Sequence, residues 1–262
     1  AKMKNLLVLP RGMFAAGNMT LANIYPITAS LGLIGYRSYD TSVQWSFPLC
    51  LCSLIIIVAI SVILVVTMKE KEKRRIMMSK IGIFMADGCE EIEGLTVVDI
   101  VRRAKMDITM ISVNGKREVT SSHGVTFLAD AVAEEVDYGA LDGIVLPGGM
   151  PGTLHLLDHA TVNEVIKKFA GEGKLVAAIC AAPSVLGAAG ILEGRRATCH
   201  PGFEEKLTGA ATSEDAVVVD GNIITSRGMG TAIPFALEIV RYFADDAAVE
   251  HIKDGLVYHV VQ

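Results

Sequence analysis

The sequence lacks the cysteine spacing of a disulfide framework or a zinc site. Its five cysteines, at positions 50, 52, 89, 180 and 199, are an odd number without a regular interval. Cys50-x-Cys52 has no second pair that would complete a metal site. The absence of these patterns excludes a disulfide-stapled scaffold and favours a reducing compartment.

The larger part of the chain also lacks a basic stripe. Residues 1–76 hold 9 Lys and Arg and 3 Asp and Glu, a net charge of +6. Residues 77–262 hold the other 15 Lys and Arg and 26 Asp and Glu, a net charge of −11. An acidic segment of this kind cannot neutralise a phosphate backbone. We therefore expect no nucleic-acid partner. The total of 262 residues allows one large or two ordinary domains.

The one long apolar run lies near the N-terminus. Residues 47–67 are 21 residues without a charge, which is enough to cross a bilayer as a helix. Five Lys and Arg follow within residues 69–75, and positive residues beside a span stay on the cytoplasmic side. This pattern predicts a transmembrane helix at 47–67, a basic linker at 68–78, and a membrane-anchored protein whose C-terminal domain is cytoplasmic.

A weaker apolar stretch precedes this run and predicts a membrane-associated or re-entrant segment over residues 1–46. An uncleaved signal sequence fits poorly, because no small-residue cleavage site stands before the charges. The chain begins with Ala1, and Met77 and Met78 stand where the pattern changes. Residues 1–76 could therefore be the tail of a membrane protein, such as a polytopic transporter, joined to a complete soluble domain.

From residue 80 onward, short apolar strands alternate with segments of helical periodicity. The alternation predicts a mainly parallel sheet with helices on both faces. In such sheets the ligand site lies beyond the carboxyl ends of the strands. We expect strands at 81–85, 108–113, 143–146 and 175–179, helices at 91–104, 161–170 and 231–244, and hairpins within 119–128 and 217–225.

Residues 175–184 read LVAAICAAPS, a strand that stops at a thiol before a Pro that opens a helix. Small residues two places on either side, Ala178 and Ala182, allow strand and helix to approach while Cys180 occupies a strained turn. The helix N-terminus would favour the thiolate over the thiol. The alternative is a buried cysteine that serves as a small hydrophobe.

Other candidates follow strand ends. Glu93 could hold its proton beside an apolar strand end, hydrogen-bond a thiolate and shuttle that proton. Gly148 and Gly149 could expose two N–H groups to an oxyanion, or form a plain turn. His200 places an imidazole beside a proline. The segment 226–231, which contains Arg227, could bind an anion or cap the last helix.

Five motifs in this order resemble the ThiJ/PfpI superfamily over residues 79–258, and most closely the branch of the Parkinson-disease-associated stress protein and its bacterial glyoxalase III or deglycase relatives. The resemblance implies a flavodoxin-like α/β sandwich with a nucleophile elbow, a domain over 79–262, and a homodimer. The motifs are GCEEIE (88–93), LPGG (146–149), AAICAAP (177–183), HP (200–201) and TSRGMGTA (225–232).

The resemblance also implies a chemistry. Cys180 would be the nucleophile, Glu93 the carboxyl that hydrogen-bonds it and His200 a third polar group, while N–H groups of Gly148, Gly149 and Ala181 would hold an oxyanion. Such a site converts a small carbonyl substrate, methylglyoxal, to lactate. The same attack on early adducts of methylglyoxal would be a deglycase activity. No metal, glutathione or other cofactor is implied.

Relatives often carry Arg where this chain has His123, so this candidate substrate contact is expected to depend on pH. Cys89 and Cys199 could resolve an oxidised Cys180 into a disulfide. A redox-sensing stress protein or chaperone that needs only Cys180 is the alternative function. A PfpI-type protease fits less well, because those members place His directly after the nucleophile and this chain has Ala181.

Overall fold

The computed structural model describes residues 46–258. Its first element is the helix α2 (Ser46–Met78), which includes the residues predicted as a basic linker, 68–78. Among the residues that are described, no helix is long and apolar enough to cross a membrane. This finding corrects the prediction of a transmembrane helix at 47–67 and of membrane anchoring. The membrane-associated segment predicted for residues 1–46 lies almost entirely outside the described residues.

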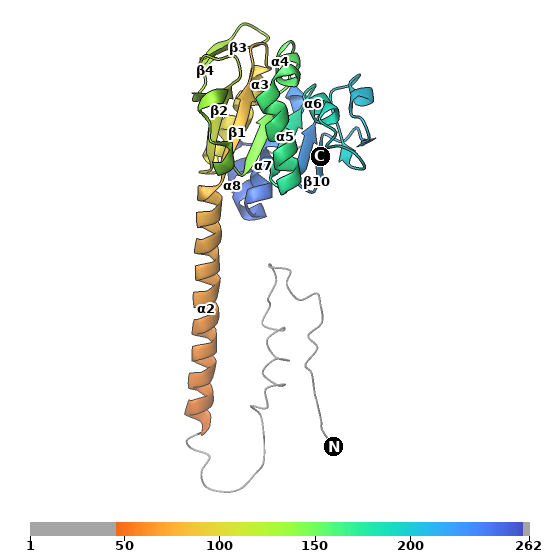
Figure 1. Cartoon of the computed structure of the whole chain (residues 1–262). Coiled ribbons are helices and arrows are strands. Elements are labelled where there is room, and N and C mark those ends of the chain that lie inside the picture. Colours follow the sequence, from red (N-terminus) through yellow and green to blue (C-terminus); the bar gives the residue numbers. More distant parts are fainter. Residues whose placement is uncertain (1–45, 259–262) are drawn as a thin grey trace, which may run out of the picture. The chain divides into compact units, whose positions relative to one another are not determined.

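The α/β part is built on a seven-stranded sheet in the order β10-β11-β7-β6-β1-β2-β5 (Figure 1). Every neighbouring pair is parallel except β10 and β11, which form an antiparallel hairpin. The predicted flavodoxin-like, mainly parallel sheet is therefore present. The strands are β1 (Lys80–Met85), β2 (Asp107–Ser112), β5 (Ala131–Val132), β6 (Gly143–Leu146), β7 (Leu175–Ile179), β10 (Val217–Asp220) and β11 (Ile223–Ser226).

Helices cover both faces because the central strands are apolar on both sides; every residue of β6 and β7 is buried. One core lies between the sheet and α3, α7 and α8, and a second lies between the sheet and α4, α5 and α6. The helices are α3 (Glu91–Arg103), α4 (Gly152–Asp158), α5 (Ala160–Glu172), α6 (Pro183–Ala188), α7 (Ala232–Phe243) and α8 (Asp246–Leu256).

Small elements complete the domain. The predicted hairpin within 119–128 is present as a separate two-stranded sheet, and a second small sheet joins two further short strands in parallel. Single turns of 3-10 helix connect several elements. The strands of the two small sheets are β3 (Glu118–Thr120), β4 (Thr126–Leu128), β8 (Arg196–Ala197) and β9 (Ala211–Thr212), and the 3-10 turns are η2 (Ala133–Glu135), η3 (Tyr138–Ala140), η4 (Glu204–Lys206) and η5 (Met229–Thr231).

The strand order places the site. The chain leaves β1 toward β2 on one side and later fills β6, β7 and β11 on the other, so the order reverses between β1 and β6. Crevices at such a point, outside the carboxyl ends of the strands, bind ligands. The segments that follow β1, β6, β7 and β11 contain Glu93, Gly148, Cys180 and Gly228, respectively.

Candidate active site

Cys180 occupies a strained turn between β7 and α6. Its φ is +66°, a left-handed conformation that costs a residue with a side chain roughly 1–2 kcal/mol. Two backbone hydrogen bonds hold it: the Cys180 N–H donates to the carbonyl of Ser226 (3.0 Å), and the Cys180 carbonyl accepts from the N–H of His200 (2.8 Å). Pro183 begins α6 directly after the turn. The strain is therefore maintained by neighbouring segments and aims the thiol outward from the strand end.

Glu93 lies one turn into α3 and is only 1% exposed. Its Oε2 accepts a hydrogen bond from the N–H of Gly148 (2.9 Å), and its side chain hydrogen-bonds that of Cys180. Burial raises the pKa of Glu93 to about 7, although both hydrogen bonds oppose the rise, and the charge of Glu90 adds to it. A carboxyl with this pKa exchanges its proton near neutral pH.

Two glycines bring the segment after β6 against this pair. A Cβ at Gly148 would lie 2.6 Å from Cβ of Cys180 and 2.8 Å from Oε2 of Glu93, distances that atoms cannot adopt. Gly149 has φ +91°, and a Cβ there would overlap the backbone of Glu90. Both positions therefore require glycine.

The Cys180 thiol and the Glu93 carboxyl titrate as a pair. Burial and the negative charge of Glu93 raise the pKa of the Cys180 thiol to about 12, while hydrogen bonds from the N–H groups of Ala181 and Gly149 lower it. Each group's pKa therefore depends on whether the other group carries a proton. Above neutral pH Glu93 is ionised and Cys180 keeps its proton, so the pair holds one proton. The N–H of Gly148 is taken by Glu93, so Gly149 and Ala181 are the candidates left for the predicted oxyanion site, whose role remains a prediction.

His200 is exposed and lies at the same opening. Its Nδ1 is 3.0 Å from the carbonyl oxygen of Pro201. A carbonyl only accepts hydrogen bonds, so Nδ1 carries the proton and Nε2 is left as the basic nitrogen. A Cβ at Gly228 would lie 3.7 Å from Cδ2 of His200, 3.9 Å from Oε1 of Glu93 and 4.0 Å from Sγ of Cys180. The three predicted catalytic side chains therefore meet in front of Gly228.

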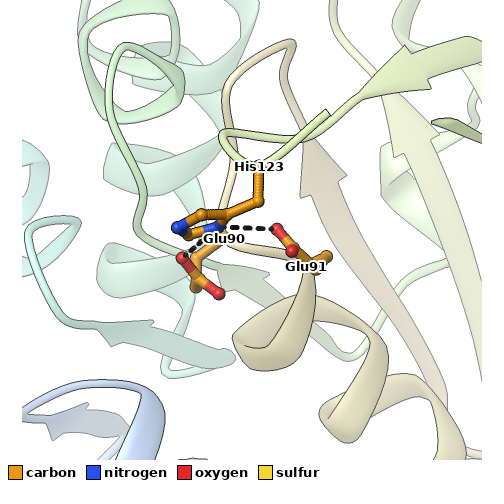
Figure 2. Close-up of side chains that lie close together, drawn as sticks. All are labelled: Glu90, Glu91 and His123. Carbon is orange, nitrogen blue, oxygen red and sulfur yellow. Dashed lines mark hydrogen bonds and ion pairs between the residues drawn. The ribbon is translucent and has the colours of Figure 1, made fainter. Parts of the chain in front are cut away.

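His123 lies at a neighbouring cluster at the start of α3 (Figure 2). Its side chain is 66% exposed, and its Nδ1 is 3.4 Å from Oε2 of Glu90 and 3.3 Å from Oε2 of Glu91. Over residues 46–258 these three residues form the one group of three His, Cys, Asp or Glu side chains whose potential metal-ligating atoms lie within 4.8 Å of one another. The carboxylates also face the positive end of the α3 dipole, so the ion pair and the helix account for the cluster.

The remaining candidates have different surroundings. Arg227 is partly buried, and its charge lowers the pKa of the Cys199 thiol, although burial and Glu204 raise that pKa overall to about 11. Cys89 is also a buried free thiol, and burial raises its pKa to about 12. Thiols of this kind react slowly with oxidants. The substrate role of Arg227 and the redox roles of both cysteines remain predictions.

Two residues that support the site were not singled out by sequence reasoning. Ser226 supplies the carbonyl that holds the Cys180 N–H, and Gly228 forms the wall that the three side chains face. Both lie in the TSRGMGTA motif, where the sequence pattern indicates an anion site or a helix start but no contact with the thiol. Which backbone atoms face the thiol depends on the pairing of β11 with β7.

A thiol on a strained turn at the end of a parallel sheet, paired with a buried carboxyl, defines an α/β protein with a cysteine nucleophile elbow. Residues 79–242 match the DJ-1/PfpI family, and the chain belongs to that family. The resemblance read from the five motifs is thereby confirmed.

Individual relatives match the same region. The chain is 39% identical over 180 residues to Protein DJ-1 homolog B of Arabidopsis thaliana, a match that covers 68% of this chain and 41% of the relative, so the chain spans less than half of that protein. It is 35% identical over 156 residues to the glutathione-independent glyoxalase DJR-1.2 of Caenorhabditis elegans, a match that covers 59% of this chain and 82% of the relative. The structure of oxidized DJ-1 from Toxoplasma gondii superposes with a TM-score of 0.67 at 34% identity, and this match covers 69% of this chain and 98% of that one.

Proposed function

We propose that the protein is a cysteine-dependent, glutathione-independent enzyme that converts small 2-oxoaldehydes such as methylglyoxal to 2-hydroxy acids. The observation that carries this proposal is the buried Glu93–Cys180 pair, which faces the N–H groups of Gly149 and Ala181. The name of the Caenorhabditis relative, a glutathione-independent glyoxalase, supports it. The same attack on early methylglyoxal adducts would give the deglycase activity.

The first step forms a hemithioacetal. Sγ of Cys180 adds to the aldehyde carbon while the ionised Glu93 takes the thiol proton. The aldehyde oxygen becomes an oxyanion that the N–H groups of Gly149 and Ala181 stabilise. Glu93 then returns the proton to this oxygen, and its buried carboxyl is again ionised. A pKa of about 7 suits a group that takes and returns a proton in one cycle.

The second step isomerises the adduct. The basic Nε2 of His200 removes the hydrogen of the former aldehyde carbon as a proton, and the imidazolium returns it to the neighbouring carbon. Glu93 moves the hydroxyl proton of the first carbon to the oxygen of the neighbouring carbon. The product is a thioester of the 2-hydroxy acid on Cys180, an isomer of the hemithioacetal. Water then cleaves the thioester, which releases lactate and the thiol. Atoms balance as methylglyoxal plus water giving lactate.

The proposal is tested by incubating the full chain with methylglyoxal in the absence of glutathione and measuring lactate. We expect turnover that saturates with methylglyoxal concentration. Lactate formation no faster than in a protein-free blank would contradict the proposal. Sedimentation of the same sample tests the homodimer that the family resemblance implies, which remains a prediction.

The second candidate is the redox sensor, which the unequal burial of the thiols favours. Cys180 is partly exposed and has Glu93 and two N–H groups to stabilise added oxygens, whereas Cys89 and Cys199 are buried. We expect peroxide to add two oxygens to Cys180 at least about 10-fold faster than it modifies either buried thiol. Peptide mass spectrometry measures this. A disulfide between Cys180 and either of the other two would instead support the resolving role.

A further inference from the structure

We propose that Gly228 determines the size of substrate that the site accepts. It leaves room in front of the thiol for the two reacting carbons of a slim 2-oxoaldehyde, and any side chain at this position would fill that room. This inference deepens the proposed function and rests on it for the identity of the substrate. The space itself is a property of the fold.

The space is bounded by the three reacting groups. A single atom placed as Cβ of Gly228 would touch His200, Glu93 and Cys180 at 3.7 to 4.0 Å, which are ordinary van der Waals distances. A substrate carbon bonded to Sγ lies much closer to the sulfur than this 4.0 Å. If it is also within reach of both proton-transfer groups, it lies closer than van der Waals contact to a methyl group at residue 228. A methyl group on residue 228 and the reacting carbons of a substrate therefore compete for one volume.

The backbone of Gly228 cannot move away from the site. Its N–H donates to Oγ1 of Thr231 (3.1 Å), and its carbonyl accepts from the N–H of Thr231 (2.8 Å). Oγ1 of Thr231 is 2.7 Å from Oγ of Ser226, and the carbonyl of Ser226 accepts from the N–H of Cys180 (3.0 Å). These hydrogen bonds connect the backbone of Gly228 to that of Cys180. A side chain added at position 228 would therefore stay in front of the thiol.

The backbone conformation at this position does not itself require glycine. Gly228 has φ 162° and ψ −169°, an extended conformation that any residue can adopt. An alanine at this position fits the fold without a steric overlap. Glycine at position 228 is therefore explained by the space it leaves in the site, in contrast to Gly148 and Gly149, which packing requires.

The test compares Gly228→Ala with Gly230→Ala in the full chain. Gly230 lies two residues further along, and a Cβ there has no atom within 4 Å, so this variant is a matched control. Alkylation of Cys180 by iodoacetamide is followed by peptide mass spectrometry, and turnover is measured with glyoxal and with the larger methylglyoxal. We expect Gly228→Ala to slow alkylation at least about 10-fold and to reduce kcat/KM more for methylglyoxal than for glyoxal, with Gly230→Ala close to wild type.

The outcomes separate this inference from the proposed function. Alkylation of Gly228→Ala at the wild-type rate would overturn the inference, whatever the turnover. An equal loss of kcat/KM for both aldehydes in Gly228→Ala would also overturn it. If the wild type forms no hydroxy acid but Gly228→Ala still blocks alkylation, the proposed function fails and the size limit at the thiol stands. A thermal unfolding midpoint like that of Gly230→Ala confirms that the variant is folded.

Discussion

Cys180→Ser is expected to reduce the kcat for lactate formation from methylglyoxal by about 10³-fold or more. A serine hydroxyl is a far weaker acid than a thiol, and a carboxyl with a pKa of about 7 cannot take its proton efficiently. The hydroxyl fits the space of the thiol, and the left-handed turn is set by the backbone bonds to Ser226 and His200. The unfolding midpoint should therefore stay close to that of the wild type.

The matched control for this variant is Cys199→Ala. It removes a buried free thiol to which the proposed reaction assigns no step. We expect turnover close to wild type for Cys199→Ala. Retention of lactate formation by Cys180→Ser, measured on protein freed of wild-type contamination, would show that the thiol is not the nucleophile.

Glu93→Gln is expected to lose turnover and to gain stability above neutral pH. The amide keeps an acceptor for the N–H of Gly148 but cannot move a proton, so kcat should fall about 10²- to 10⁴-fold. The pKa of Glu93 in the folded protein, about 7, lies above the ordinary glutamate value of 4.5. Folded protein therefore binds the proton more tightly, and stability is lost as pH rises from 4.5 to 7. At pH 8 the raised pKa of Glu93 lowers the free energy of unfolding by about 3 kcal/mol.

Urea unfolding at about pH 5 and pH 8 measures this effect. The free energy of unfolding of the wild type should be lower at pH 8 than at pH 5. In Glu93→Gln this difference between the two pH values should be smaller by about the contribution of Glu93. Glu205→Gln, the same substitution at an exposed carboxylate, should leave the difference unchanged. A Glu93→Gln protein that is less stable than the wild type at pH 8 would show that burial of the ionised Glu93 carboxylate does not destabilise the fold.

Much of the α/β fold follows from the sequence, because buried parallel strands are short apolar runs between turn residues. The structure places β6 and β7 over the predicted residues, 143–146 and 175–179. Two helices were not predicted. α4 begins at Gly152, within a Pro-Gly pair that reads as a turn. α8 begins at Asp246, directly after Asp245, whose side chain caps the N–H of Ala248. That cap was a readable signal.

The region before residue 79 shows the limit of an apolar count. The run at 47–67 predicts a span from composition alone, and α2 is indeed helical there, but none of the described helices qualifies as a membrane span. Helical periodicity and hydropathy are local properties. They do not by themselves determine what surrounds a helix.

Part of the candidate site could be assembled from the sequence, because Glu93 and Cys180 follow strands that end at the same edge of the sheet. His200 instead follows β8, a strand of a separate small sheet. The structure brings Glu93, Cys180 and His200 together in front of Gly228. The sequence could not show that His123 pairs with Glu90 and Glu91, since that contact depends on how the hairpin of β3 and β4 lies against α3. Nor could it show that burial places the pKa of Glu93 near 7.

The pH dependence of kcat/KM for lactate formation tests the central claim, that Glu93 takes the proton from the Cys180 thiol. Below about pH 7 both groups hold their protons, so kcat/KM should fall about tenfold per pH unit and level off above pH 7. His200→Ala should lower the whole profile and keep this limb, because the limb belongs to Glu93. A profile that is flat from about pH 5 to 8, or an unchanged limb when Glu93→Gln is combined with His200→Ala, would contradict the account.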